Sequence, residues 1–353
     1  MKKILALALA SAMALSLAAC GGSSSGSSAS TSAPAASAPA ASAPAASAPA
    51  ATEKAEEPAE ENKTYLVGIC QLVQHPALDA ATQGFKDVLV AKFGDAVSFD
   101  EGNAAGDSAT CATIVDGFVA EKADLIMANA TSPLQAAASA TNTIPVLGTS
   151  VTDYATALEI DDWTGTVGTN ISGTSDLAPL DQQAAMLQEL FPDAKTVGML
   201  YCSAEPNSVY QIETVTGYLT EMGYECANFA FNDSNDVSSV AQAAADACDV
   251  IYIPTDNTAA SNTEAIANVV IPAGVPVIAG EEGICSGCGV ATLSIDYYDL
   301  GSATGEMAVK ILTGEADVAT MPVEYAPQVT MKYNADIANA LGVQIPDTYV
   351  EIG

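Results

Sequence analysis

The sequence predicts an α/β protein with two lobes, each built on a parallel sheet flanked by helices. Two observations predict this fold. From Thr64 onward, short apolar runs alternate with amphipathic segments, which is typical of βαβ units whose strands are covered on both faces. The first 63 residues differ in composition from the rest of the 353-residue chain, so the foldable part has about 290 residues, enough for two domains of ordinary size.

The expected strands are the apolar runs of strand length. They cover residues 65–73, 124–131, 144–151, 196–202, 226–231, 250–256 and 275–280. Most of these runs are continuously apolar rather than alternating. Strands of this kind are favoured in parallel sheets that are buried on both faces.

Helical patterns lie between most of the expected strands. They cover residues 78–93, 109–122, 133–141, 181–190, 209–222, 237–248 and 259–270. A stretch rich in Gly, Thr and Asp interrupts the alternation from Thr152 to Asp176, and we interpret it as a crossover between the lobes. A late helix at residues 297–314 is expected to return to the first lobe. The expected lobes are residues 64–176 with about 297–320, and residues 177–296 with about 321–353.

The N-terminal segment has the pattern of an export signal. Residues 1–19 carry two lysines, an apolar stretch and small residues, the order of a secretory signal peptide too short to span a membrane. Residues 17–20 resemble the bacterial lipobox, in which the cysteine is lipidated; the alternative is an ordinary cleavage site before a cysteine. Residues 20–63 contain SAPAA four times, and we interpret them as a disordered linker. We expect an exported protein anchored to the outer face of the cytoplasmic membrane through lipidated Cys20.

Charge limits the partners of the protein. The net charge is −33, and the chain contains no arginine. A phosphate-rich partner needs clustered positive charge to release counterions, so nucleic-acid binding is excluded as a function class. An anionic ligand cannot be held by a bidentate guanidinium fork and must be bound by other donors.

The cysteine pattern argues against a disulfide framework. Seven cysteines remain besides Cys20, an odd number for an exported protein. Cys285 and Cys288 have motif spacing, but the only histidine, His75, is far away in the sequence and a zinc site needs about four ligands. We expect no metal and no cofactor. For Cys285 and Cys288 we favour two free thiols in a loop, with a local disulfide as the alternative.

Four strand-to-helix turns have a similar composition, with two in each lobe. They are His75-Pro76, Thr131-Ser132, the turn from Glu205 to Ser208, and Asp256-Asn257. Their polar residues are typical helix caps, which is the structural alternative. If the lobes face each other, the helix N-termini share one cleft, where free N–H groups bind a carboxylate. Glu205, Asp256, Glu281 and Asp296 are then available for an ammonium group, so the cleft is suited to a zwitterion such as an amino acid.

Enzyme signatures are absent from the sequence. A single histidine cannot supply the paired ligands of zinc hydrolases, and neither a G-x-S-x-G motif nor a Walker A lysine motif is present. The only tryptophan, Trp163, lies in the crossover. We favour a packing role for it over contact with an aromatic ligand. We therefore expect no catalytic residues.

Several segments together resemble the ABC-transporter substrate-binding proteins of the tryptophan/tyrosine-type family. These segments are residues 75–85 (HPALDAATQGF), 131–141 (TSPLQAAASAT), 190–213, 251–269 and 295–315. The resemblance implies a type I periplasmic-binding-protein fold and capture of a small ligand, often an aromatic amino acid, for delivery to a permease. Carried over by motif, the ligand-binding residues are Gln71, His75, Asp79, Thr131, Ser132, Glu205, Asn207, Ser208, Asp256, Asn257, Glu281 and Asp296. The sequence departs from relatives at residues 151–154 and in the CSGC segment.

The expected function is that of an extracytoplasmic solute-binding lipoprotein of an ABC importer. It would act as a monomer that closes two lobes on an amino acid, and its partners would be a permease and the membrane. The alternatives are a ligand-sensing receptor coupled to a signalling partner and an extracellular hydrolase on the same fold. For His75, the sequence leaves open whether the ring touches the ligand or only shapes the turn.

Overall fold

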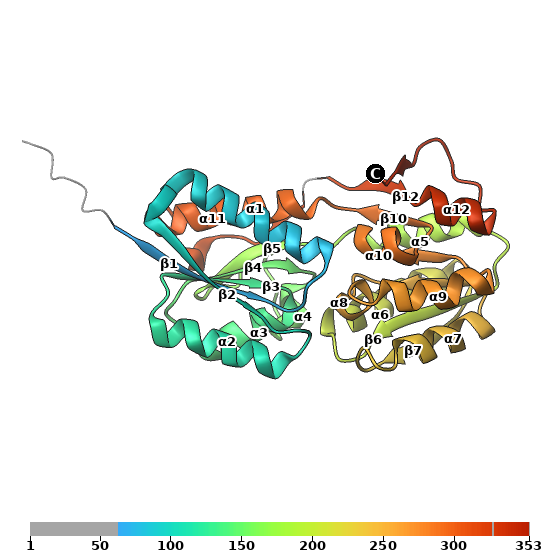
Figure 1. Ribbon diagram of the computed structural model, residues 1–353, viewed down its shortest axis with the longest axis horizontal. Coiled ribbons are helices and arrows are strands. Elements are labelled where there is room, and N and C mark those ends of the chain that lie inside the picture. Colours follow the sequence, from blue (N-terminus) through green and yellow to red (C-terminus); the bar gives the residue numbers. More distant parts are fainter. Residues whose placement is uncertain (1–62, 327, 353) are drawn as a thin grey trace, which may run out of the picture. The chain divides into compact units, whose positions relative to one another are not determined.

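The computed structural model describes residues 63–326 and 328–352. The predicted signal peptide, Cys20 and the linker up to residue 62 lie outside the described residues. Within the described ranges, no helix combines the length and the apolar character that crossing a bilayer requires. The chain forms two sheets, each covered by helices on both faces (Figure 1).

The first sheet has six strands within the described residues. They are β1 (Tyr65–Gln71), β2 (Val97–Asn103), β3 (Leu125–Asn129), β4 (Val146–Val151), β5 (Ile171–Ser175) and β11 (Glu324–Tyr325). Their order is β11-β5-β4-β3-β1-β2, and every pair is parallel. The carboxyl ends of these strands therefore lie at one edge of the sheet.

Helices cover both faces of this sheet. On one face lie α1 (Pro76–Phe93) and α11 (Tyr297–Leu312), and on the other lie α2 (Ser108–Glu121), α3 (Thr131–Ala140) and the short α4 (Tyr154–Ala157). A 3-10 turn, η1 (Gly94–Ala96), follows α1, and another, η2 (Val318–Thr320), follows α11. α1 and α11 are far apart in the sequence but pack side by side along their length (Figure 1). The late helix thus belongs with the first sheet.

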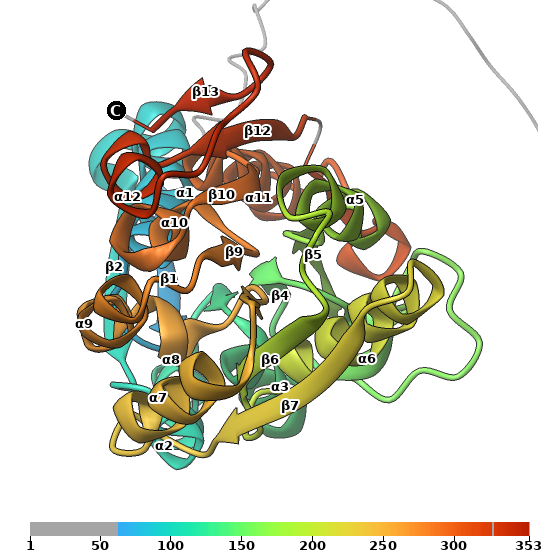
Figure 2. The same cartoon turned by 90° about the vertical axis from the view of Figure 1, so that its right-hand side faces the viewer.

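The second sheet has seven strands in the described part of the chain. They are β6 (Thr196–Cys202), β7 (Glu225–Phe231), β8 (Val250–Ile253), β9 (Val277–Ala279), β10 (Ala291–Ser294), β12 (Thr330–Tyr333) and β13 (Val350–Glu351). Their order is β13-β12-β10-β9-β8-β6-β7. All pairs are parallel except β10 with β12, which is antiparallel. The last two strands form one edge of the sheet, next to α12 (Ala335–Leu341) (Figure 2).

The helices of the second lobe also form two layers. α5 (Leu180–Leu190), α6 (Pro206–Glu221) and α12 cover one face, and α7 (Val237–Ala247), α9 (Thr263–Ala273) and α10 (Glu282–Cys288) cover the other. The short α8 (Asn257–Ala260) follows β8. The predicted architecture of two α/β lobes with predominantly parallel sheets is confirmed.

Three chain segments connect the two lobes. They lie between β5 and α5, between β10 and α11, and between β11 and β12. Because β11 pairs with β5, residues 324–325 belong to the first sheet. The return to the second lobe therefore follows Tyr325 and not the expected boundary near residue 321.

Six strands in the described part of the chain were not among the expected strands: β2, β5, β10, β11, β12 and β13. β2 and β5 are the longest of those in the first sheet. β2 is an edge strand with alternating exposure, and its sequence VSFDEGN lacks a continuous apolar run. β5 has the sequence ISGTS and is fully buried although only Ile171 is a large apolar residue. The interpretation of residues 152–176 as one crossover was therefore wrong. Helix α11 packs against β5 and helps to bury it.

Two predicted segments of the second lobe also differ from the structure. The expected helix at residues 259–270 is two helices, α8 and α9, with a break at Ser261 and Asn262. Cys285 and Cys288 lie in helix α10 and not in a loop, and both are buried free thiols. Their spacing of three residues places them on one helical face, where they pack into the core.

Candidate functional site

The strand-to-helix turns of the two lobes meet at His75 and Asn257. His75 immediately precedes α1, which starts at Pro76, and Asn257 is the first residue of α8. The Nε2 atom of His75 lies 3.2 Å from Oδ1 of Asn257, and both side chains are buried. Because Oδ1 of an amide only accepts, the contact requires a proton on Nε2. The only histidine therefore links the lobes through a direct hydrogen bond.

Two cavities lie next to this contact, and residues from both lobes line each of them. One has a volume of about 300 Å³ and is lined by Leu72, Val73 and Ser132 of the first lobe and by Glu205 and Asn257 of the second. The other has a volume of about 490 Å³. It is lined by Pro76, Ala77 and Tyr297 next to the first sheet and by Glu281 and Glu282 of α10. Val73 and Pro76 flank His75, so the turn before α1 contributes to both cavities.

Glu205 supports the start of α8. Its Oε2 accepts from the backbone N and Nδ2 of Asn257 at 3.0 and 2.7 Å, and its Oε1 accepts from the backbone N and Oγ1 of Thr258 at 2.8 and 2.7 Å. A carboxylate offers about four lone-pair positions. The carboxylate of Glu205 is thus occupied by the turn that presents Asn257 to His75.

Asp256 caps α8 and joins it to β6. Its Oδ1 accepts from the backbone N of Ala259 at 2.8 Å, and its Oδ2 accepts from the backbone N of Cys202 at 2.7 Å. Burial, together with the nearby charge of Glu205, raises the pKa of Asp256 to about 8. Asp256 therefore fixes the geometry of the turn from within the second lobe.

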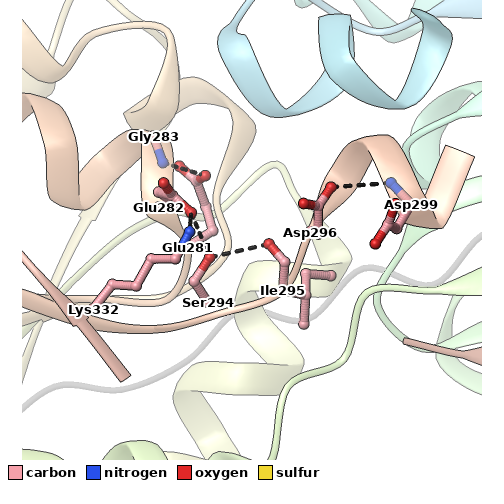
Figure 3. Close-up of polar contacts among 8 residues, drawn as sticks. All are labelled: Glu281, Glu282, Gly283, Ser294, Ile295, Asp296, Asp299 and Lys332. Carbon is pink, nitrogen blue, oxygen red and sulfur yellow. Dashed lines mark hydrogen bonds and ion pairs between the residues drawn. The ribbon is translucent and has the colours of Figure 1, made fainter. Parts of the chain in front are cut away.

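Glu281 and Asp296 are also helix caps (Figure 3). Glu281 accepts from the backbone N of Gly283 at 2.6 Å and of Ile284 at 2.5 Å. Burial raises the pKa of Glu281. Asp296 is exposed, and its Oδ1 accepts from the backbone N of Asp299 at the start of α11. Both residues line the larger cavity, Glu281 as a buried and Asp296 as an exposed residue.

An ion pair between Lys332 and Glu282 lies beside Glu281. Lys332 of β12 donates to Oε2 of Glu282 at 2.6 Å, and Ser294 donates to the same oxygen at 2.8 Å (Figure 3). Both partners of the ion pair are partly exposed. The contact connects α10 with two strands of the second sheet, so it rigidifies the wall and leaves no free cation there.

The other predicted residues follow strands β1, β3 and β6. Gln71 donates to Asp79 at 2.7 Å and accepts from Thr82 at 2.7 Å, which ties β1 to α1. Asn207 donates to the carbonyl of Thr255 at 3.0 Å. The buried members of this set are Gln71, Thr131, Ser132, Asn207 and Ser208, whereas Asp79 is exposed. The structure thus has the predicted residues at or next to the carboxyl edges of the two sheets, where Asp79 and Asp296 are exposed.

Further polar residues at these edges were missed from the sequence. Asp176 and Tyr297 form a buried hydrogen bond of 2.9 Å. Ser150 and Ala130 have positive φ angles of 54° and 101°, which are uncommon for residues other than glycine and often mark functional sites. The Oγ of Ser150 is buried and has no hydrogen-bond partner among the described residues. Asp176 ends the stretch that was interpreted as a crossover. Its position directly after a polar strand is the sequence signal that could have identified it as a site residue.

The aromatic residues of the first lobe form a small stack. Trp163 packs on Tyr154, with ring centroids 6.4 Å apart and an interplanar angle of 16°. The hydroxyl of Tyr154 donates to the carbonyl of Thr174. Trp163 is part of the hydrophobic core on that face of the sheet, so its packing role is evident.

The buried acids give the protein a defined pH dependence. Burial raises the pKa of Asp176, Asp256 and Glu281. Between its unfolded and its folded pKa, each acid binds more protons in the folded state than in the unfolded state. Its stabilising contribution is complete below the unfolded pKa and disappears as pH rises through the folded pKa. For Asp256 this interval runs from 3.8 to about 8.

We expect the melting temperature to fall as the pH is raised from about 5 to about 8. Differential scanning calorimetry at constant ionic strength measures the slope. Asp256→Asn should make the slope shallower because that residue no longer titrates, whereas Asp162→Asn, at an exposed position, should leave it unchanged. A melting temperature that rises across this interval would contradict the assignment.

Metal-ligating groups do not gather in the described part of the chain. No cluster of three or more His, Cys, Asp or Glu side chains with metal-site geometry occurs there. The acids of the site are instead hydrogen-bonded to backbone N–H groups at helix N-termini. The arrangement is suited to positioning polar groups around a small polar molecule.

Comparisons with known proteins agree with this arrangement. Residues 66–351 match the family model described as ABC transporter substrate binding protein. A curated tyrosine-binding protein from Clostridioides difficile (strain R20291) is 35% identical over 288 residues, which cover 81% of this chain and 83% of that protein.

Two solved structures extend the comparison. An ABC domain from Streptococcus pneumonia in complex with L-Trp is 34% identical, with a TM-score of 0.77 and coverage of 81% of this chain and 97% of that chain. The ligand-free, open structure of a substrate binding protein with adhesive properties from Clostridium difficile is 37% identical, with a TM-score of 0.62 and coverage of 82% and 99%. The two α/β lobes, their three connections and these matches together identify the chain as a member of the ABC transporter substrate-binding protein family, with the type I periplasmic-binding fold.

Proposed function

We propose that this protein captures an aromatic amino acid between its lobes and delivers it to the permease of an ABC importer. The observation that carries the proposal is the buried contact of 3.2 Å between His75 and Asn257, which joins a strand-to-helix turn of one lobe to a strand-to-helix turn of the other. The names of the relatives support the ligand class, since one is a tyrosine-binding protein and another was solved with L-Trp. The site performs no chemistry on its ligand.

Hinge closure is the proposed mechanism. Three connections join the lobes, and a ligand that contacts both lobes stabilises the closed form in proportion to its preference for that form. The open, ligand-free relative gives a TM-score of 0.62 although it is 37% identical, whereas the L-Trp complex gives 0.77 at 34% identity. This difference supports a closed arrangement of the lobes in the present structure.

The proposal includes a location for the protein. The resemblance of residues 17–20 to a lipobox supports anchoring through lipidated Cys20, and we propose that the segment up to residue 63 links the binding lobes to the membrane. We propose that the protein acts as a monomer on the outer face of the cytoplasmic membrane. Replacement of Cys20 with Ala should release it from the membrane fraction.

Isothermal titration calorimetry tests the ligand class. Purified protein, refolded from denaturant to remove any co-purified ligand, is titrated with L-tryptophan, L-tyrosine, L-phenylalanine, L-leucine and L-glutamate. We expect saturable binding of at least one aromatic amino acid at a stoichiometry near one. Absence of heat with every aromatic amino acid would overturn the ligand assignment.

His75→Asn should weaken ligand binding without unfolding the protein. The imidazole joins the lobes only when they are closed, so its loss penalises the closed form by about 1 to 2 kcal/mol, or about 10-fold in affinity. The melting temperature of the unliganded protein should change little. Gln74→Ala, at the exposed neighbouring position, is the matched control. Unchanged affinity with a lower melting temperature would mean that His75 only shapes the turn.

A further inference from the structure

Asp176 differs from the other buried acids of the site in its hydrogen bonding. It directly follows β5, at the carboxyl edge of the first sheet, and only 4% of its surface is exposed. Its Oδ2 accepts from the hydroxyl of Tyr297 at 2.9 Å. Its Oδ1 is buried and has no hydrogen-bond partner within residues 63–326 and 328–352. A buried polar atom without a partner is costly, and it needs an explanation.

Among the described residues, no lysine pairs with this carboxylate. The chain has no arginine, and the ion pairs among the described residues are Lys86–Glu101 and Lys332–Glu282. The other buried acids are capped: Glu205 accepts four close hydrogen bonds from Asn257 and Thr258, and Asp256 and Glu281 each accept two backbone N–H groups. Asp176 is therefore the buried acid with the largest unused capacity for a donor.

Asp176 adjoins the cleft through its hydrogen-bond partner Tyr297. Tyr297, which holds Oδ2, lines the cavity of about 490 Å³ together with Pro76, Ala77 and Glu281. His75 lies close enough to oppose the effect of burial on the pKa of Asp176 and of Glu281. The Nδ1 atom of His75 is likewise buried without a partner among the described residues. His75, before α1, and Tyr297, at the start of α11, thus lie near Asp176.

We propose that Asp176 binds the α-ammonium group of the amino-acid ligand and that Tyr297 positions its carboxylate. An ammonium group provides the donors that Oδ1 lacks, together with a full positive charge beside the carboxylate. The inference rests on the proposed function, since it assigns one residue to one group of that ligand. It makes Asp176 the residue that distinguishes an amino acid from the same molecule without its amino group.

Calorimetric titration of the wild-type protein and of Asp176→Asn tests the assignment. The ligands are L-tryptophan and L-tyrosine, each paired with the analogue that lacks the amino group, 3-indolepropionate and 3-(4-hydroxyphenyl)propionate. The wild type should prefer the amino acid by about 100-fold or more. Asp176→Asn should bind the amino acid about 100-fold more weakly and should lose most of this preference.

Two further variants serve as references. Tyr297→Phe removes the positioning hydrogen bond and should weaken amino-acid binding about 10-fold while the preference over the analogue persists. Asp299→Asn changes an exposed acid on the same helix and should leave binding unchanged. The melting temperature of each variant verifies folding.

The outcomes separate this inference from the proposed function. Failure of the wild type to bind any aromatic amino acid would overturn the function itself. Binding that occurs with equal affinity for the analogue would overturn only the role of Asp176, and this comparison needs no variant. A preference that persists in Asp176→Asn would overturn it as well.

Discussion

Replacement of Glu205 with alanine should lower the free energy of unfolding by about 3 to 5 kcal/mol. The carboxylate accepts from two backbone N–H groups and two side chains at the start of α8. Alanine leaves these donors, at Asn257 and Thr258, without their acceptor in a place where water is largely excluded. Urea-induced unfolding followed by circular dichroism measures the change.

Two variants define the origin of this effect. Glu205→Gln keeps one acceptor oxygen but turns an N–H₂ group toward the donors of α8, so an intermediate loss of about 2 kcal/mol is expected. Glu213→Ala, at an exposed position of α6, should change the free energy by no more than about 0.5 kcal/mol. A loss below about 1 kcal/mol for Glu205→Ala would show that the turn re-forms its hydrogen bonds with water.

Gly301→Ala should lower the free energy of unfolding by about 2 to 3 kcal/mol. A Cβ atom on Gly301 of α11 would overlap the backbone carbonyl of Ala81 on α1, and one on Gly84 of α1 would overlap the carbonyl of Tyr298. The two glycines therefore allow the helix backbones to approach closely. A methyl group at this position must separate α1 from α11 and disrupt the buried layer between them.

The matched control for this variant is Gly117→Ala. Gly117 is exposed in α2, and a Cβ atom there meets no neighbour within 4 Å. That variant should gain up to about 1 kcal/mol because alanine favours the helix over glycine. Opposite signs for the two substitutions are expected in thermal unfolding. Equal stabilisation by both would mean that the helices have room to adjust.

The helix contact also has a consequence for the ligand site. α11 begins at Tyr297, whose hydroxyl donates to Asp176. A shift of α11 away from α1 would therefore move Tyr297 relative to the cleft. We expect Gly301→Ala to weaken ligand binding as well as folding, although Gly301 lies one turn away from the site.

The alternation of apolar runs and helical patterns was sufficient to predict the two parallel-dominated sheets. Strands such as β3 and β8 are apolar along their whole length because both of their faces are covered. β5 escaped prediction because its cover comes from other elements, so its own sequence needs few apolar residues. β12 runs antiparallel to β10, which nothing in its local sequence specifies.

The sequence predicted the turns that carry the candidate site residues, but not the role of each side chain. Spacing and residue type placed His75, Glu205, Asp256 and Asn257 at strand-to-helix junctions, and the structure has them there. The sequence offered Glu205 and Asp256 for an ammonium group. In the structure these carboxylates accept backbone N–H groups, which corresponds to the capping alternative.

The sequence by itself determined the two-lobed α/β fold, the polar turns at the strand ends and the lack of arginine in the cleft. The tertiary structure alone decided where the chain returns to the second lobe, that His75 reaches Asn257, and that Asp176 keeps a free oxygen. The physical reason is the range of the interactions. Periodicity and capping depend on neighbours within a few residues, whereas the hydrogen bonds of His75 and Asp176 link positions 182 and 121 residues apart.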